Sequence, residues 1–399
     1  MQTAATAATV RRLMRCGLLG LVAALLLAAL ALAPPVTSVR AATMVTNCND
    51  SGAGSLRDAI TNAAAGDTVN FAQDCTDTNT ITLTGSLTPT VNVTIDATVG
   101  NRTVTMGGNN AVQLFIVNSG VTLGLRGLTL TGGNVGNVGN GGRNRAIFNS
   151  GTVTITGSTF SGNFAGAGGA IYNNGSGTLT VTGSTFANNN AGIVGGAIFN
   201  SGTVNIMGST FSGNSADNGG AIYNDGGGML TVTGSTFANN NTVNGGGAII
   251  NYGTLTVTNS TFANNSADNG GAIYNNSGAI YNNGSGTLTV TNSTFANNGA
   301  NHGGAIYNNG GGTLTLTLSV AAGNSAPYGG PDIFGTVTTD GGGNVVGDTS
   351  DSSGLTATSD RTGTAAAPLD PLLGRLANYG GPVQTLALLP GSPAIDILA

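Results

Sequence analysis

The chain has 399 residues, of which 68 are glycine and only 7% are charged, and its 11 basic and 16 acidic residues are all arginine and aspartate. This composition offers no basic patch for phosphates, so we exclude nucleic acid as a partner. Glycine, threonine, asparagine and serine form helices poorly, which argues against a mainly helical protein. Regularly spaced Ile, Leu, Val and Phe indicate an ordered core instead of disorder.

Residues 1–41 have the pattern of an export signal. Three arginines precede an apolar run over residues 18–33, which is shorter than the roughly 20 residues needed to span a bilayer. Small residues follow, and we expect cleavage between Ala41 and Ala42. The mature chain is therefore predicted to be secreted or displayed at the cell surface, without a transmembrane span. Its seven remaining arginines against 16 aspartates give a net charge of −9.

Residues 42–78 are predicted to form an N-terminal cap. Ser55 has the place of a helix N-cap, and apolar residues repeat with helical spacing from residue 56 to residue 63. A short helix here would cover the open end of a repeat array, where an exposed strand invites edge-to-edge association. Arg57 and Asp58 on this helix are interpreted as an exposed pair, and a functional site at residues 55–60 is the alternative.

Cys48 and Cys75 are the two cysteines of the exported chain. In an exported protein a disulfide between them is the expected state, and two unpaired thiols are the alternative. Closing this loop would stabilise the fold by about 3–4 kcal/mol in the chain-entropy model. Neither a histidine nor a third cysteine lies close by in the sequence, so we predict no metal site here.

Residues 79–345 are predicted to form the body of the fold, because they repeat a phrase of the form GGAIYN, LTVT, STFANN. A period of about 25 residues predicts a solenoid. With three strands in each coil, we predict an all-β, right-handed, single-stranded parallel β-helix of the pectate-lyase-like kind. The phenylalanine of the phrase recurs at intervals of 26, 25, 26, 25 and 33 residues, at Phe160, Phe186, Phe211, Phe237, Phe262 and Phe295.

Equivalent residues of successive coils are predicted to stack into columns. Side chains alternate along a strand, so the Leu and Val of LTVT face inward and its threonines face outward. Each buried Leu, Ile, Val or Phe contributes about 1.5–3 kcal/mol. The predicted core columns include Ile171, Leu179, Val181, Phe186, Ile222, Phe237, Phe262 and Phe295.

Two further features of the repeat lead to predictions. The asparagines that follow each Phe are expected to fill the turns and to hydrogen-bond up and down the stack. A seven-residue phrase at 271–277 is followed at once by a second copy at 278–284, which explains the interval of 33. We predict a looped-out bulge or a local kink at this duplication.

Residues 346–399 contain several prolines and are predicted to form an irregular segment, a final irregular coil followed by an extended part that folds back over the C-terminal end. GGNVVG at 342–347, the stretch from LDPLLGRL to GSPAID at 369–396 and SLRDAI at 55–60 resemble the choice-of-anchor Q domain of bacterial secreted or surface β-helix proteins. The GGAI and Phe-x-x-Asn phrases resemble the repeats of polymorphic outer membrane proteins. Those proteins are surface adhesins built as β-helices, so the resemblance implies surface display.

Candidate catalytic residues are few. In the regular array, Asp217 and Asp268 occupy equivalent turns two coils apart, about 10 Å by strand spacing. Glycoside hydrolysis uses two carboxylates roughly 5–10 Å apart. His302 occupies the same corner one coil further on. Because aspartate also favours turns, we interpret these residues as structural and predict neither an enzyme nor a cofactor. A polysaccharide lyase or glycoside hydrolase is the alternative.

The sequence favours an adhesin-like, monomeric protein that displays a repetitive polar face to glycans or to a surface. The basis is a long polar array with very little ionisable chemistry. A second alternative is binding to ice or another crystal through outward Thr-x-Thr rows, although threonine is also a common exposed strand residue. Calcium binding of the nonapeptide type is not expected, because its Gly-Gly-x-Gly-x-Asp repeat does not recur.

Overall fold

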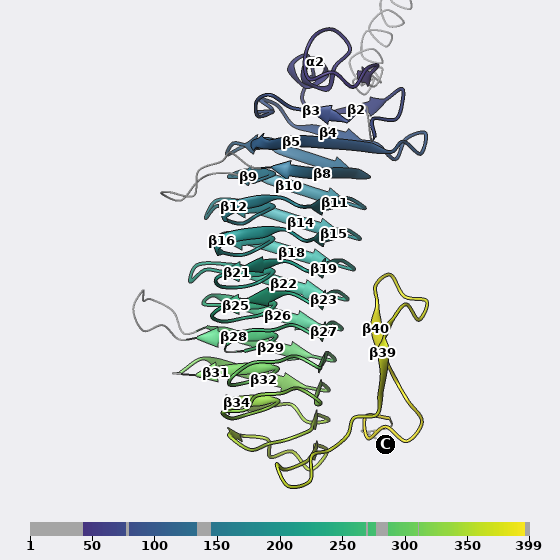
Figure 1. Ribbon diagram of the computed structural model, residues 1–399. Helices are drawn as coiled ribbons and strands as arrows, with labels where there is room; N and C mark the ends of the chain where they lie inside the picture. The colour runs from purple at the N-terminus through teal and green to yellow at the C-terminus, as the bar shows by residue number, and fades with distance from the viewer. Residues whose placement is uncertain are drawn as a thin grey trace, which may run out of the picture. The chain divides into compact units, whose positions relative to one another are not determined.

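The structure is a computed structural model that describes residues 43–76, 80–133, 145–268, 270–276, 286–309 and 311–395. These residues form a parallel β-solenoid of about 11 turns with about 26 residues per turn (Figure 1). Most coils contribute one strand to each of three parallel sheets, which we call sheets A, B and C. The predicted all-β solenoid with a short N-terminal helix is confirmed.

Sheet A contains the LTVT segments, and its burial follows the predicted alternation. In β14, Leu179 and Val181 are fully buried, whereas the threonines on either side are half-exposed. The parallel register places Val204 and Ile206 of the next coil directly beside these two residues. Among the described residues the sheet has 12 strands: β1 (Thr43–Val45), β2 (Asp67–Phe71), β4 (Val93–Asp96), β7 (Thr122–Arg126), β10 (Thr152–Thr156), β14 (Thr178–Thr182), β18 (Thr203–Met207), β22 (Met229–Thr233), β26 (Thr254–Thr258), β29 (Thr287–Thr291), β32 (Thr313–Thr317) and β35 (Thr339–Asp340).

Sheet B contains the phenylalanine column. From Phe160 to Phe295 the rings are fully buried and stacked, with centroids 4.7–4.9 Å apart and planes within 9° of parallel. Its described strands number 12: β3 (Ile81–Thr82), β5 (Val104–Val112), β8 (Leu128–Gly133), β11 (Thr159–Ser161), β15 (Thr185–Ala187), β19 (Thr210–Ser212), β23 (Thr236–Ala238), β27 (Thr261–Ala263), β30 (Thr294–Ala296), β33 (Val320–Ala321), β36 (Val345–Val346) and β38 (Arg361–Thr362).

Sheet C contains the isoleucine column. In the strand Ile-Tyr-Asn, Ile and Asn face inward and the aromatic residue faces outward, as in β13. Ten strands of this sheet lie within the described ranges: β6 (Phe115–Val117), β9 (Ile147–Asn149), β13 (Ile171–Asn173), β17 (Ile198–Asn200), β21 (Ile222–Asn224), β25 (Ile249–Asn251), β28 (Ile273–Asn276), β31 (Ile306–Asn309), β34 (Ile333–Thr336) and β37 (Ser352–Ser353).

A fourth, small sheet lies at the corner between sheets B and C, where the sequence predicted only turns. Its inward positions are small residues, Ala165, Ala191 and Ala216 in the first three strands and Thr242 in the fourth, which let the corner run extended. In later coils this corner is reduced to isolated bridges at Ser266 and Gly299. The strands are β12 (Phe164–Ala167), β16 (Asn190–Val194), β20 (Ser215–Ala216) and β24 (Asn241–Thr242).

The asparagines after each Phe form a continuous hydrogen-bonded column, which we call the asparagine ladder. From Asn189 onward, each side-chain oxygen accepts from the backbone N–H and from the Nδ2 of the asparagine one coil before it; between Asn189 and Asn214 both bonds are 3.0 Å. Each Nδ2 also donates to the carbonyl of a phenylalanine or leucine. The predicted stacking is therefore confirmed. The ladder comprises Asn163, Asn189, Asn214, Asn240, Asn265, Asn298 and Asn324.

A second polar column, the serine ladder, runs beside the phenylalanines. The backbone N–H of each serine donates to the Oγ of the serine in the next coil, and each Oγ donates to a carbonyl two residues before it. The ladder comprises Ser158, Ser184, Ser209, Ser235, Ser260, Ser293 and Ser319. Buried polar groups in both ladders are thus satisfied by the neighbouring coils.

The duplicated phrase at 271–284 leaves the register of the solenoid intact. Ile273, from the first copy, pairs with Ile249 on one side and Ile306 on the other. The next strand, β29, is also in register, with Leu288 beside Leu255. The second copy falls within 277–285, outside the described residues, so the bulge or kink stays a prediction.

The N-terminal helix α2 (Leu56–Thr61) begins at Ser55, whose side chain accepts from the Asp58 N–H, and it buries one apolar side. The predicted exposed pair between Arg57 and Asp58 is wrong. Arg57 instead donates to Asp50 at 2.7 Å and to the carbonyl of Gly85 at 2.6 Å. Consecutive helix residues point in different directions, so Arg57 faces the first coils while Asp58 accepts from backbone at the helix start.

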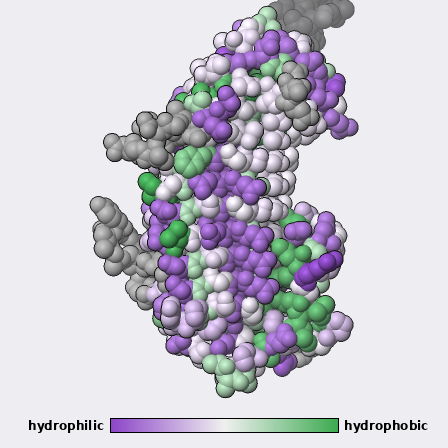
Figure 2. All heavy atoms as spheres, viewed as in Figure 1, coloured by the Kyte–Doolittle hydropathy of each residue, from purple (hydrophilic) through white to green (hydrophobic). Residues whose placement is uncertain are grey.

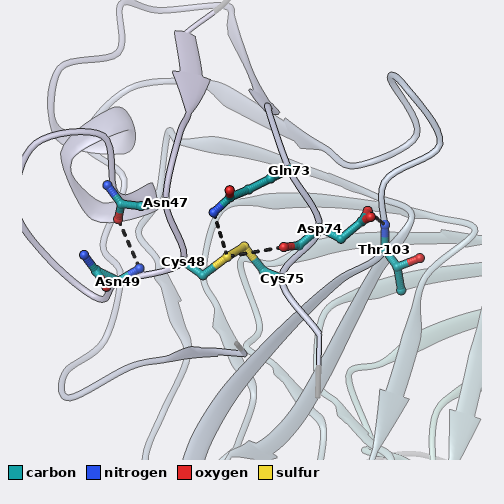
Figure 3. Close-up of a disulfide and its surroundings, with 7 residues drawn as sticks. All are labelled: Asn47, Cys48, Asn49, Gln73, Asp74, Cys75 and Thr103. Carbon is teal, nitrogen blue, oxygen red and sulfur yellow. Dashed lines mark hydrogen bonds between the residues drawn. A yellow bond between two sulfur atoms is a disulfide. The ribbon is translucent and has the colours of Figure 1, made fainter. Parts of the chain in front are cut away.

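Cys48 and Cys75 form the predicted disulfide (Figure 3). The bond joins the segment before α2 to the edge of the first coils, where Cys75 bridges to Val104. Neighbouring groups reinforce the link, because Gln73 Nε2 lies 3.6 Å from Cys48 Sγ and the Asp74 carboxylate accepts from Thr103 N at 2.8 Å (Figure 3). The segment before α2 is therefore held covalently at the edge of the first coils.

The C-terminal segment begins with the predicted final coil, because β37 pairs with β34 and β38 pairs with β36. Its extended part was predicted to fold back over the C-terminal end, and this is wrong. It forms an antiparallel hairpin of β39 (Leu373–Ala377) and β40 (Thr385–Leu388) beside sheet B (Figure 1). Leu386, with Leu373 and Leu376, packs on Ala263 and Ala296 of the outer face. Alanine at these outward positions leaves a shallow apolar strip that the leucines fill. Hydrophobic side chains gather over this region in Figure 2.

Within the described ranges, none of the helices is both long enough and apolar enough to cross a membrane.

We expect Asn214→Ala to destabilise the solenoid strongly. The substitution leaves the buried donors of Asn189 without acceptors, and each such loss costs about 1–3 kcal/mol. Asn190→Ala is the matched control, since Asn190 is exposed and bonds only Ser215 through its side chain. Urea denaturation followed by circular dichroism should give a lower midpoint for Asn214→Ala alone; equal midpoints for both variants would contradict a stabilising ladder.

Candidate functional site

The two candidate acids lie at exposed corners and are not brought together. The backbone carbonyl of Asp217 accepts from Asn244 N, and that of Asp268 accepts from Asn301 N. One complete coil separates them. At this corner Ser215 pairs with Asn241 of the next coil, and Asn241 bridges in turn to Ser266 of the coil after it. Both residues therefore act locally as turn residues, and their role in catalysis stays a hypothesis.

His302 packs among aromatic rings at the same corner. Its ring lies edge-on to Phe334, with centroids 5.6 Å apart, and 5.8 Å from the ring of Tyr328. Its backbone N–H donates weakly to the Asp268 carbonyl at 3.4 Å. These contacts fit a packing role for the imidazole.

An aromatic row on the outer face of sheet C was not singled out from the sequence. From Phe148 to Tyr223 successive rings stack with centroids 4.5–5.6 Å apart, and Tyr307 stacks on Phe334 at 4.9 Å. The Arg145 guanidinium lies 4.4 Å from the centre of the Tyr172 ring. Outward alternation in Ile-Tyr-Asn is the signal that could have identified it. Because the rings cover each other's faces, the row presents mainly ring edges to solvent.

The outer face of sheet A is the most regular surface of the solenoid. Seven successive strands, from β10 to β32, each place three side chains outward, and nearly all of them are threonine. Rows are about 4.8 Å apart across strands and about 6.6 Å apart along them. The exceptions are uncharged: Asn205, Met207 and Met229. We call this surface the threonine face.

A buried and a half-buried carboxylate, Asp332 and Asp360, lie at the C-terminal end. Asp332 continues the asparagine ladder, because its Oδ1 accepts from both N and Nδ2 of Asn324, at 3.2 and 2.8 Å. The backbone N–H of Ser319, the last serine of the ladder, donates to Asn344 Oδ1, and the N–H of Asn344 donates to Asp360 Oδ1 at 2.8 Å. Asp360 therefore ends the serine ladder. Burial raises the pKa of Asp332 to about 6, and burial followed by the nearby Asp340 raises the pKa of Asp360.

The described part of the chain holds no group of three or more His, Cys, Asp or Glu side chains placed to bind a metal ion.

Comparison with known families identifies a repeat. Residues 157–174, 208–225 and 259–276 match the Chlamydia polymorphic membrane protein repeat. The three matches begin 51 residues apart and cover the run from sheet B to sheet C in alternate coils. Repeats of this kind suggest a cell-surface or outer-membrane location. The resemblance to the choice-of-anchor Q domain stays a prediction.

Comparison with whole proteins adds less. No curated protein sequence matches the chain. Among solved structures, a PL6 alginate lyase in complex with a trisaccharide is similar at 12% identity and a TM-score of 0.31, over 88% of this chain and 92% of the lyase chain. At that level of similarity we draw no inference about activity.

The raised pKa of Asp332 predicts a stability that increases in acid. The folded-state value of about 6 exceeds the ordinary 3.8, so this contribution is complete below about pH 4 and is lost as pH rises through 6. We expect a difference of about 3 kcal/mol between pH 7 and pH 4. Denaturation of wild type and Asp332→Asn across this range isolates the effect, because the variant cannot ionise. A constant difference between the two proteins would contradict it.

Proposed function

We propose that this chain is an exported surface protein that uses the threonine face to contact glycans or another extended surface. The observation that carries the proposal is the unbroken run of outward, uncharged side chains over seven strands of sheet A. The repeats of the polymorphic membrane protein kind support the surface location.

The chemistry of threonine suits this role. Each side chain offers one hydroxyl, which both donates and accepts, beside a methyl group. Branching at Cβ restricts its rotamers, so little side-chain entropy is lost when a contact forms. Single contacts of this kind are weak, but a partner that repeats can engage many at once. A polysaccharide with regularly spaced hydroxyls is such a partner.

The enzyme alternative has less support from the geometry. Asp217 and Asp268 lie at exposed corners with a whole coil between them, and His302 packs among aromatic rings. The same binding experiment separates the two functions, because a lyase or hydrolase would shorten the glycan that it binds.

The test uses residues 42–399 on a glycan array and on whole cells. We expect micromolar binding that falls at least tenfold in the triple variant Thr180→Arg, Thr256→Arg, Thr289→Arg, since bulky charges then interrupt the central row of the threonine face. The matched control is Thr185→Arg with Thr210→Arg, which changes equally half-exposed threonines of sheet B.

Two results would count against the proposal. Equal binding by the triple variant and the control would place the contact elsewhere on the solenoid. Release of shortened or unsaturated sugars during incubation would favour the lyase or hydrolase alternative.

Ice or another crystal surface is the second candidate partner, favoured by the two-dimensional regularity of the same face. We expect thermal hysteresis in the wild-type protein and its loss in the triple threonine variant. Absence of hysteresis in the wild type would dispose of this candidate and leave the glycan proposal untouched.

A further inference from the structure

A cavity of about 590 Å³ lies between the last coils and the segment that leads into the hairpin. This volume is in the range of small-molecule sites, roughly 300–1,000 Å³. Its wall is largely apolar and includes Pro327, Pro331 and Leu369. The charged residues that line it are all acidic, namely Asp332, Asp348 and Asp370.

Asp348 places a nearly buried carboxylate in the wall of this cavity. The residue is only 6% exposed. Its Oδ1 accepts from Ser350 N at 2.9 Å and from Ser350 Oγ at 2.6 Å. Its second oxygen, Oδ2, accepts no hydrogen bond from the described residues. A carboxylate oxygen in the wall of a largely apolar cavity is stabilised when a cation or a donor meets it.

Two further acids line the same cavity and add negative charge to it. Asp332 is 2% exposed and accepts the Asp348 N–H through Oδ2 at 2.7 Å. Asp370 is exposed at the rim, where Oδ1 accepts from Leu372 N. Repulsion from Asp348 adds to burial in raising the pKa of Asp332. A positive charge in the cavity would relieve this repulsion.

We propose that the cavity binds a small organic cation, a primary ammonium on a short alkyl body. The ammonium would donate to Asp348 Oδ2, and the alkyl part would pack on Pro327, Pro331 and Leu369. A bare divalent metal suits the site less well, because the described residues do not include a cluster of three metal-binding side chains. This site lies apart from the threonine face, so the inference does not depend on the proposed function.

The test is isothermal titration of residues 42–399 with pentylammonium, and with pentan-1-ol as the neutral probe of equal length. We expect pentylammonium to bind at least tenfold more tightly than the alcohol. Asp348→Asn should abolish that preference, because an asparagine keeps the acceptor for Ser350 and replaces only the unpartnered oxygen. Asp225→Asn, which removes the same charge at a half-buried corner of another coil, is the matched control and should bind as wild type.

Proton release on binding gives a second readout. Among the charged groups that face Asp332, the cavity offers only Asp348 and Asp370 within the described residues. Binding of the cation should therefore release protons near pH 6 and weaken as pH falls from 7 to 5. Equal affinity for alcohol and ammonium, unchanged affinity in Asp348→Asn, or tighter binding of Ca²⁺ at the same site would each overturn the proposal.

Discussion

The central constraint on this molecule is that a coil can be completed only by its neighbours. The buried amide of Asn214 bonds to the coils before and after it, and the Phe211 ring is covered by Phe186 and Phe237. A single coil would leave these donors, acceptors and rings facing water. Stability therefore comes from stacking, and the two ends, where neighbours are missing, need separate solutions.

The two ends meet this need with different chemistry. At the N-terminal end, helix α2 and the Cys48–Cys75 disulfide cover the first coils. At the C-terminal end, both polar ladders run into carboxylates, Asp332 and Asp360. A carboxylate accepts without having to donate, so it can terminate a column in which every member donates toward the C-terminus. Burial disfavours the charged form of a carboxylic acid, and it raises the pKa of both Asp332 and Asp360.

Features that follow from the period were predictable from the sequence, and features that depend on a single long-range contact were not. The columns containing Leu179, Val181 and Phe186 recur at fixed spacing, so alternation alone assigns them to the core. The partner of Arg57 depends instead on where the cap meets the first coils. The docking of Leu386 on Ala263 brings together residues more than one hundred positions apart. The cavity around Asp348 has the same origin, because the last coils and the tail form it jointly.

The one-way direction of the asparagine ladder has a consequence for how such proteins change in length. The asparagine of each inner coil accepts two hydrogen bonds from the coil before it and donates two to the coil after it. A whole coil can therefore be added or deleted while the N-terminal cap and Asp332 keep the same hydrogen bonds to their neighbours. The 51-residue spacing of the matched repeats fits growth by pairs of coils. The threonine face would lengthen in proportion, and avidity for a repeating partner would rise with copy number. Gene duplication could then adjust binding strength while the fold, the ends and the individual contacts stayed the same.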